Sequence, residues 1–160
     1  MADSFADHVE DFLAAEKFAA RRYRWRPKSN QEWLQAKIQL LVPSGKLSTH
    51  SQLILTTHRY RKPRKYSFVL HYCGECVLRL DVDPHRTHTN PVTLDVIRCT
   101  HWQEWPCTTA EPDDRSLGYL DWFREFLKRA NIEYKWRLVP PPEHVVQLEF
   151  SYERDDSSRG

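Results

Sequence analysis

The stretch YSFVLHYCGECVLRLDVD, residues 66–83, predicts a β-hairpin that decides how the sheet is built. Two runs of alternating apolar and polar residues flank CGEC, which contains the turn. A two-residue Gly-Glu loop would put Phe68 and Leu70 on the same face as Arg79 and Asp81, so both faces would mix charges with apolar side chains. A three-residue loop shifts the pairing by one residue and separates them, so we expect three residues in the loop.

In this register the hairpin has one apolar face and one polar face. The apolar side chains are Tyr66, Phe68, Leu70, Tyr72, Leu78, Leu80 and Val82. The polar side chains are Ser67, His71, Arg79, Asp81 and Asp83, followed along the chain by Pro84, His85 and His88. We expect the apolar face to pack on the core and the polar face to carry the functional residues.

Periodicity in the rest of the chain predicts an α+β protein, with an antiparallel β-sheet meander flanked by an N-terminal helix and a second helix after the sheet. The N-terminal helix is expected over 4–25, where Ser4 and Asp7 form a capping box, and the second helix over 113–131, with aspartates at its start and Asn131 as its left-handed stop. The expected strands are 32–42, 51–60, 65–72, 76–83, 96–105, 134–139 and 144–152. Residues 1–154 form one domain, and 155–160 are a frayed tail.

Composition narrows the functional classes. The chain has 160 residues, of which 40% are hydrophobic, and its formal net charge is +2. It contains no apolar run of the roughly 20 residues that a membrane span needs, and its acidic start is unlike a signal peptide. We therefore expect a cytoplasmic protein with no membrane association, in which the four cysteines stay reduced. The sequence has no Gly-x-Ser-x-Gly elbow and no glycine-rich phosphate loop, and we assign it no cofactor.

The cysteines raise the question of zinc. Cys73-x-x-Cys76 has the spacing of a zinc knuckle, and Cys99-x-His101 would complete a set of four ligands. A second CxxC or an HxxxH motif is missing, so half of the usual pattern is absent. The alternative is that these cysteines are small apolar side chains near a turn, and we assign no metal site.

Histidines close to basic residues are compatible with metal-independent RNA cleavage. That reaction needs a base for the 2′-hydroxyl, an acid for the leaving oxygen and a cation for the phosphate. His85, His88 and His101 would supply the proton transfers, and Arg79 or Arg59 would supply the cation. The alternative is that the histidines are loop residues that cap turns.

Two segments, ARRYRWRPK (20–28) and HRYRKPRK (58–65), interleave basic residues with aromatic ones. Arginine and lysine neutralise phosphates while aromatic rings stack on unpaired bases, so both segments are candidates for nucleic-acid binding. The candidate residues are Arg22, Arg24, Arg59, Arg61, Lys62 and Arg64. For 20–28 the alternative is a solvated basic surface whose aromatic residues anchor a helix end.

The order HRYR, LRLDVDPHRTHTNP, IRCTHWQEW and WFREFLKRANI resembles a poorly characterised bacterial family associated with toxin–antitoxin genes. The family pattern has R-x-D on a strand, then H-x-N-P, then C-P-H-x-H, then a helix that ends in Asn-Ile, and it is distantly similar to TumE-type toxins. The resemblance covers residues 55–132. It implies a toxin-like protein that acts on RNA.

The resemblance also implies roles for individual residues. Arg59 and Arg61 match the basic start of the pattern, and Arg79 and Asp81 match its strand. The first histidine motif is matched by His88, Asn90 and Pro91, and the second histidine motif by Cys99 and His101. Two departures matter. Residues 92–95 (VTLD) follow Asn-Pro in place of Asp-Gly, and Gln103 stands where the family has a second histidine, so catalysis would fail or would use His85 instead.

Two functions follow from this sequence as hypotheses. In the first, the protein is a metal-independent ribonuclease of a bacterial or phage conflict system. His88 and His101 are then acid and base, Arg79 and Arg59 hold the phosphate, and Asp81 orients a histidine or an arginine. In the second, it is a non-catalytic binder, such as a phage-encoded inhibitor of host defence or an antitoxin-like module that zinc could stabilise. The expected partners are RNA or another nucleic acid, and a cognate antitoxin or a host or phage protein.

Overall fold

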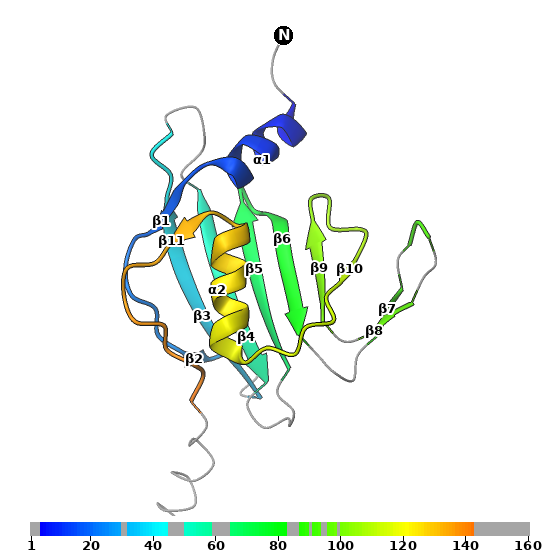
Figure 1. Ribbon diagram of the computed structural model, residues 1–160. Helices are drawn as coiled ribbons and strands as arrows, with labels where there is room; N and C mark the ends of the chain where they lie inside the picture. Colours follow the sequence, from blue (N-terminus) through cyan, green and yellow to red (C-terminus); the bar gives the residue numbers. More distant parts are fainter. Residues whose placement is uncertain are drawn as a thin grey trace, which may run out of the picture.

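The computed structural model describes residues 4–29, 32–44, 50–58, 65–82, 87–89, 91–93, 96–98 and 100–142, which fold into two helices and a large sheet (Figure 1). In chain order the elements are α1 (Phe5–Ala14), β1 (Lys17–Ala19), β2 (Arg26–Pro27), β3 (Trp33–Leu41), β4 (Ser51–His58), β5 (Tyr66–Tyr72), β6 (Glu75–Val82), β7 (Thr87–Thr89), β8 (Val96–Arg98), β9 (His101–Glu104), β10 (Glu111–Pro112), α2 (Tyr119–Arg129) and β11 (Ile132–Glu133).

The main sheet has the strand order β10-β9-β6-β5-β4-β3-β1-β11, with β2 paired to β3. The strands from β3 to β6 pair antiparallel in chain order, and β9 and β10 continue the sheet beyond β6. The predicted α+β class and the order of the two helices are therefore confirmed. The predicted simple antiparallel meander is wrong, because β1 pairs in parallel with β11 from the far end of the described chain, and β7 pairs with β8 in a separate small sheet.

The β5–β6 hairpin has the predicted faces but not the predicted loop. Its turn is the two-residue Cys73-Gly74, both with positive φ (51° and 82°), as in a turn that follows the twist of the strands. The register shifts inside the strands instead, because Leu70 pairs with Leu78 whereas His71 pairs with Cys76, which leaves Val77 as the extra residue of a β-bulge. The bulge moves the pairing by one residue, which is the effect that we assigned to a longer loop.

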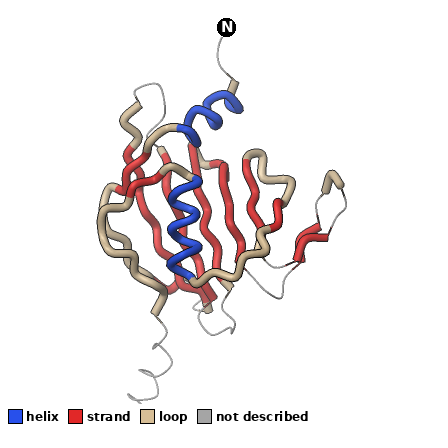
Figure 2. The backbone as a smooth tube through the Cα atoms, in the orientation of Figure 1, coloured by secondary structure: helices blue, strands red, loops and turns tan. Residues whose placement is uncertain are grey.

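Helix α2 covers the apolar face of the sheet (Figures 1 and 2). Its buried residues Trp122, Phe123, Phe126 and Leu127 follow helical spacing, and both Phe123 and Phe126 stack on Phe68 of β5. Phe126 also stacks on Trp102 of β9, with ring centroids 5.8 Å apart. Because these rings come from the helix and from two strands, the aromatic packing joins α2 to the sheet.

Helix α1 is shorter than predicted. The capping box of Ser4 and Asp7 is confirmed, but the helix ends at Ala14 rather than continuing to residue 25. The backbone of Lys17 pairs with that of Asn131, so the chain here belongs to β1 of the sheet. The buried Lys17 Nζ donates to the carbonyls of Phe12 and Ala15, both at 2.6 Å, and so satisfies groups that the end of the helix leaves free. Pairing with a distant strand overrides the helical pattern.

Three further boundaries differ from the predictions. The second helix begins at Tyr119 rather than 113, because the Asp113 carboxylate accepts hydrogen bonds from Trp102 and Arg115 instead of capping a helix. The strand predicted over 134–139 does not form, since Tyr23 bonds both backbone groups of Val139 and takes the place of a strand partner. The strand predicted over 96–105 is divided into β8 and β9.

The predictions for the stop of the second helix and for the C-terminal residues have different outcomes. The left-handed stop at Asn131 is confirmed by its φ of 55°. The strand predicted over 144–152 and the tail 155–160 lie outside the described residues. Neither of the two described helices is long and apolar enough to cross a membrane.

Replacing Phe126 with alanine should lower the free energy of unfolding by about 3–5 kcal/mol, because the side chain is fully buried between Phe68 and Trp102. Urea denaturation followed by tryptophan fluorescence measures the change. Arg124→Ala on the exposed side of the same helix is the control and should change stability by less than about 0.5 kcal/mol. Equal effects of the two substitutions would contradict this account of the core.

Candidate nucleic-acid interface

The face of the sheet opposite α2 carries polar and basic side chains. Alternation along β3 points Gln35, Lys37 and Gln39 away from the core, while the intervening Ala36 and Ile38 are buried in it. The same alternation continues through β4, β5 and β6. Both described helices contribute their buried residues to the core on the other face, so neither of them covers this one, which we call the open face.

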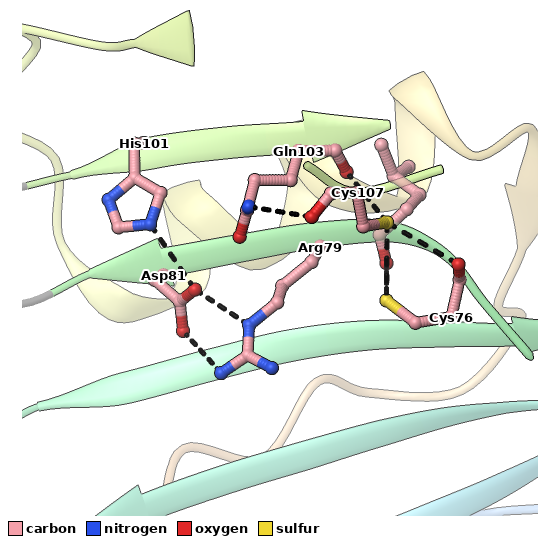
Figure 3. A network of polar contacts seen from close by, with 7 residues as sticks. Cys76, Arg79, Asp81, His101, Gln103 and Cys107 are labelled. Atoms are coloured by element: carbon pink, nitrogen blue, oxygen red, sulfur yellow. Dashed lines mark hydrogen bonds and ion pairs between the residues drawn. The ribbon is translucent and has the colours of Figure 1, made fainter. Parts of the chain in front are cut away.

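On β6 and β9, three of the predicted site residues meet (Figure 3). Arg79 donates to Asp81 through two nitrogens, from Nε to Oδ2 at 2.7 Å and from a terminal nitrogen to Oδ1 at 3.1 Å. His101, directly opposite Asp81 in the antiparallel register, places Nε2 3.4 Å from Oδ2 of the same carboxylate. Asp81 therefore contacts both a histidine and an arginine, the two kinds of partner predicted for it.

The Asp81 carboxylate is held in its charged form. Burial opposes ionisation, but the contacts from His101 and the bidentate pair with Arg79 outweigh it and lower the pKa of Asp81 to about 2. A carboxylate that stays charged keeps the guanidinium of Arg79 in one orientation. Arg79 is 39% exposed, so its free edge can reach a ligand on the open face.

His101 is placed differently from a residue that would exchange protons with a substrate. Its side chain is 5% exposed and lies against Asp81 in the sheet. In this position the imidazole contacts the carboxylate that pairs with Arg79. Its assignment as acid or base stays a prediction.

The structure places the strands that carry His88 and His101 in different sheets. His88 lies on β7, which pairs with β8 in the small separate sheet, whereas His101 lies on β9 of the main sheet. The other predicted site residues on loops lie outside the described residues: His85, Arg59, Arg61, Lys62 and Arg64.

Arg79 lines a groove of about 380 Å³ on the open face, which we call the tryptophan groove. Trp33, Lys65 and His71 also line it, and the ammonium group of Lys65 lies 5.7 Å from the centre of the Trp33 indole ring. Burial and then the charge of Arg79 lower the pKa of His71, while Glu75 opposes the shift. The groove thus combines an aromatic ring, cations and an imidazole that is neutral at pH 7.

A second groove of about 1000 Å³, the arginine groove, lies between β3 and the segment 20–27. Its basic side chains are Arg21, Arg22, Arg24, Arg26 and Lys37, and none of the described residues that line it is acidic. Tyr23 and Trp25 anchor the segment by hydrogen bonds to Val139, and Arg22, Arg24 and Arg26, which alternate with them, are exposed. Gln35 lines both grooves, so they adjoin each other.

Sequence reasoning identified Arg22 and Arg24 but missed Lys37, Trp33 and Lys28, which also line the grooves. The sequence pattern that could have identified Trp33 and Lys37 is the alternation along β3, whose outward positions before Leu41 are all polar or aromatic. His71 was placed on the polar face of the hairpin but was given no role.

Within the described chain, the cysteines do not assemble the zinc set that their spacing raised as an alternative. The Sγ atoms of Cys76 and Cys107 lie 3.5 Å apart, Cys73 is exposed in the turn, and His101 contacts Asp81. Cys99 lies outside the described residues. Among those that are described, no group of three or more His, Cys, Asp or Glu side chains is placed to hold a metal ion.

Comparison with known proteins found no family model, no curated protein and no solved structure that matches this chain. The resemblance to the toxin–antitoxin-associated family therefore stays a prediction from its motifs.

Asp81 should make the free energy of unfolding decrease as the pH falls. Its folded pKa of about 2 is below the ordinary value of 3.8, so the stabilisation is fully present above pH 4 and is lost as the pH falls through about 2. The shift corresponds to about 2 kcal/mol of unfolding free energy. Urea denaturation between pH 5 and pH 2 measures it, and Asp81→Asn should be less stable at pH 5 and less sensitive to acid. Parallel pH profiles for the two proteins would exclude this role.

Proposed function

We propose that the protein binds single-stranded RNA along the open face of its sheet, as part of a toxin-like system of bacterial or phage conflict. The observation that carries the proposal is the arginine groove, which five cations line and to whose lining no described acidic residue contributes. Phosphate groups are the ligands that such a row of cations favours, because each contact releases a condensed counterion.

The tryptophan groove supports a single strand rather than a duplex. Trp33 offers a ring on which an unpaired base can stack, and Arg79, fixed by Asp81, offers a guanidinium for a phosphate or a base edge. Since Gln35 lines both grooves, a strand can pass from the arginines to the tryptophan without leaving the open face. RNA is the nucleic acid that the motif resemblance implies.

Cleavage of the bound RNA is the second step of the proposal. His71 lines the tryptophan groove with Arg79, and its lowered pKa keeps the imidazole ready to accept a proton at pH 7. Arg79 stabilises the charge that develops on the phosphate. His88 and His85 remain the candidates for the acid, as the histidine motif proposes.

The rival function is binding without cleavage, in an inhibitor or an antitoxin-like module. The burial of His101 favours it, because one of the two motif histidines is then held against Asp81 rather than facing a substrate. Both functions use the same grooves, so a binding experiment comes first and a cleavage experiment separates them.

Reversing two charges of the arginine groove should weaken RNA binding. Arg24→Glu combined with Lys37→Glu should raise the dissociation constant for a labelled single-stranded RNA at least about tenfold and should reduce the salt slope by about 1.4. Fluorescence anisotropy over a range of salt concentrations measures both quantities.

Arg124→Glu with Lys128→Glu on α2 is the matched control, since it changes the net charge equally on the opposite side of the sheet. Its affinity should stay within about threefold of the wild type, because net charge acts weakly on binding beyond the screening distance. Equal loss in both double variants would mean that binding follows net charge, and the proposed interface would be wrong.

If the protein cleaves RNA, purified wild type should degrade it in the presence of a chelator, and His71→Ala should slow cleavage by about 100-fold or more with little change in affinity. Gel analysis of a labelled RNA at saturating protein measures the rate. Induction in bacteria gives a second measurement, in which His88→Ala with His101→Ala should restore growth and intact cellular RNA. RNA that stays intact with saturating wild-type protein would establish the binder instead.

A further inference from the structure

Two thiols meet at the end of the β6–β9 pairing, beside the Arg79–Asp81 cluster (Figure 3). Cys76 follows the hairpin turn on β6, and Cys107 lies in the connection between β9 and β10. Their Sγ atoms are 3.5 Å apart, and the Cys107 thiol also lies 3.3 Å from the Cys76 carbonyl oxygen. Both cysteines are half-buried, so a small oxidant can reach them.

We propose that Cys76 and Cys107 are an oxidation-sensitive pair that a hydroperoxide converts into a reversible disulfide. Neither the proposed binding of RNA nor its cleavage uses these thiols, so this inference is independent of the proposed function. An exposed Cys73 three residues before Cys76 provides an internal control.

The surroundings hold the two thiols in place. Gln103 donates from Nε2 to the Cys107 carbonyl oxygen at 3.0 Å, and the Cys107 amide donates to the Glu104 carbonyl at 2.6 Å. The β-bulge at Val77 brings Cys76 opposite His71 and onto the side of β6 that meets Cys107. Each sulfur is therefore positioned by a strand or by backbone hydrogen bonds, and a covalent bond needs the sulfurs to approach by about 1.5 Å.

The two thiols have different chemical roles. The hydrogen bond between the two thiols lowers the pKa of Cys76, burial opposes the shift, and the charge of Arg79 lowers the pKa further. The same hydrogen bond and then burial raise the pKa of Cys107. Cys76 is accordingly the thiolate that reacts first, and Cys107 is the thiol that resolves the product.

The reaction takes two steps. The Cys76 thiolate attacks one oxygen of the hydroperoxide, the O–O bond breaks, and the leaving alkoxide takes a proton to give an alcohol and a sulfenic acid on Cys76. Cys107 then attacks that sulfur, the S–S bond forms, and the S–O bond breaks with release of water. Two thiols and one hydroperoxide thus become a disulfide, an alcohol and water, and a dithiol reductant returns two electrons and two protons.

Peptide mapping of the oxidised protein tests the proposal. Combined cleavage after basic residues and after glutamate separates all four cysteines, because Glu75 divides Cys73 from Cys76, Arg79 and Arg98 release Cys76 from Cys99, and Glu104 divides Cys99 from Cys107. After treatment with hydrogen peroxide, we expect peptide 76–79 linked to peptide 105–115, since the Glu111–Pro112 bond resists cleavage, and we expect dithiothreitol to remove the link. A link from 76–79 to 66–75 or to 99–104, or no link at all, would overturn the proposal.

Cysteine variants and the melting temperature of the oxidised protein provide two further tests. Cys73→Ser should retain the link, whereas Cys107→Ser should abolish it and leave a sulfenic acid on Cys76 that a dimedone reagent traps. Oxidation should raise the melting temperature of the wild type by about 5–10 °C, since the bond closes a long loop, and should not raise that of Cys107→Ser. Zinc retained by the purified protein, together with thiols that resist peroxide, would assign the pair to a metal site and reject the disulfide.

Discussion

The register of the β5–β6 hairpin is the constraint on which the rest of the structure depends. The bulge at Val77 lets Phe68 pair with Leu80 and Leu70 with Leu78, so the core-facing side of the hairpin is apolar. A slip of one residue would reverse the facing of the second strand and would put Arg79 and Asp81 under α2. Burial of this ion pair beneath aromatic rings, away from His101 and from solvent, would cost several kcal/mol, so the observed register is the one that lets the helix pack.

The same register creates the candidate site. Arg79 and Asp81 are outward residues of β6, and the next strand, β9, brings His101 directly opposite Asp81. One carboxylate then contacts a guanidinium and an imidazole, and the guanidinium keeps a free edge toward the open face. The rigidity of the sheet, rather than a loop, positions the group that we assign to the phosphate, and rigid placement favours both binding and charge stabilisation.

The arrangement also explains how the proposed functions can share one surface. Four of the five cations of the arginine groove come from a segment that Tyr23 and Trp25 anchor, and the fifth, Lys37, comes from β3. The cations of the tryptophan groove come from strands and their ends. Binding needs only these groups, whereas cleavage needs a pair of proton-transfer groups as well. Among the described residues that line the two grooves, His71 is the only histidine. Replacing it therefore distinguishes cleavage, which needs a proton-transfer group, from binding, which does not.

Local signals in the sequence were reliable where neighbouring residues decide the structure. Alternation predicted β3, β4, β5 and β6, the polar face of the hairpin, and the presence of Arg79 and Asp81 on it, because a pleated strand always sends successive side chains to opposite faces. The capping box at Ser4 and the left-handed stop at Asn131 were predicted correctly for the same reason, since each depends on hydrogen bonds or dihedral angles within a few residues.

Tertiary structure decided everything that depends on partners far apart in the chain. The segment after Ala14 forms a strand because Lys17 and Phe18 pair with Ile132 and Glu133. The sequence around Lys17 does not predict this pairing. The contacts of Asp81 with His101 and of Cys76 with Cys107 join residues of separate strands and loops. The sequence suggested a histidine or an arginine for Asp81 without deciding which histidine, and it grouped Cys76 with Cys73 and Cys99 rather than with Cys107. By itself the sequence determined which side chains share a strand face, because pleating is local; only the fold decided which strands are neighbours, because pairing energies depend on the whole sheet.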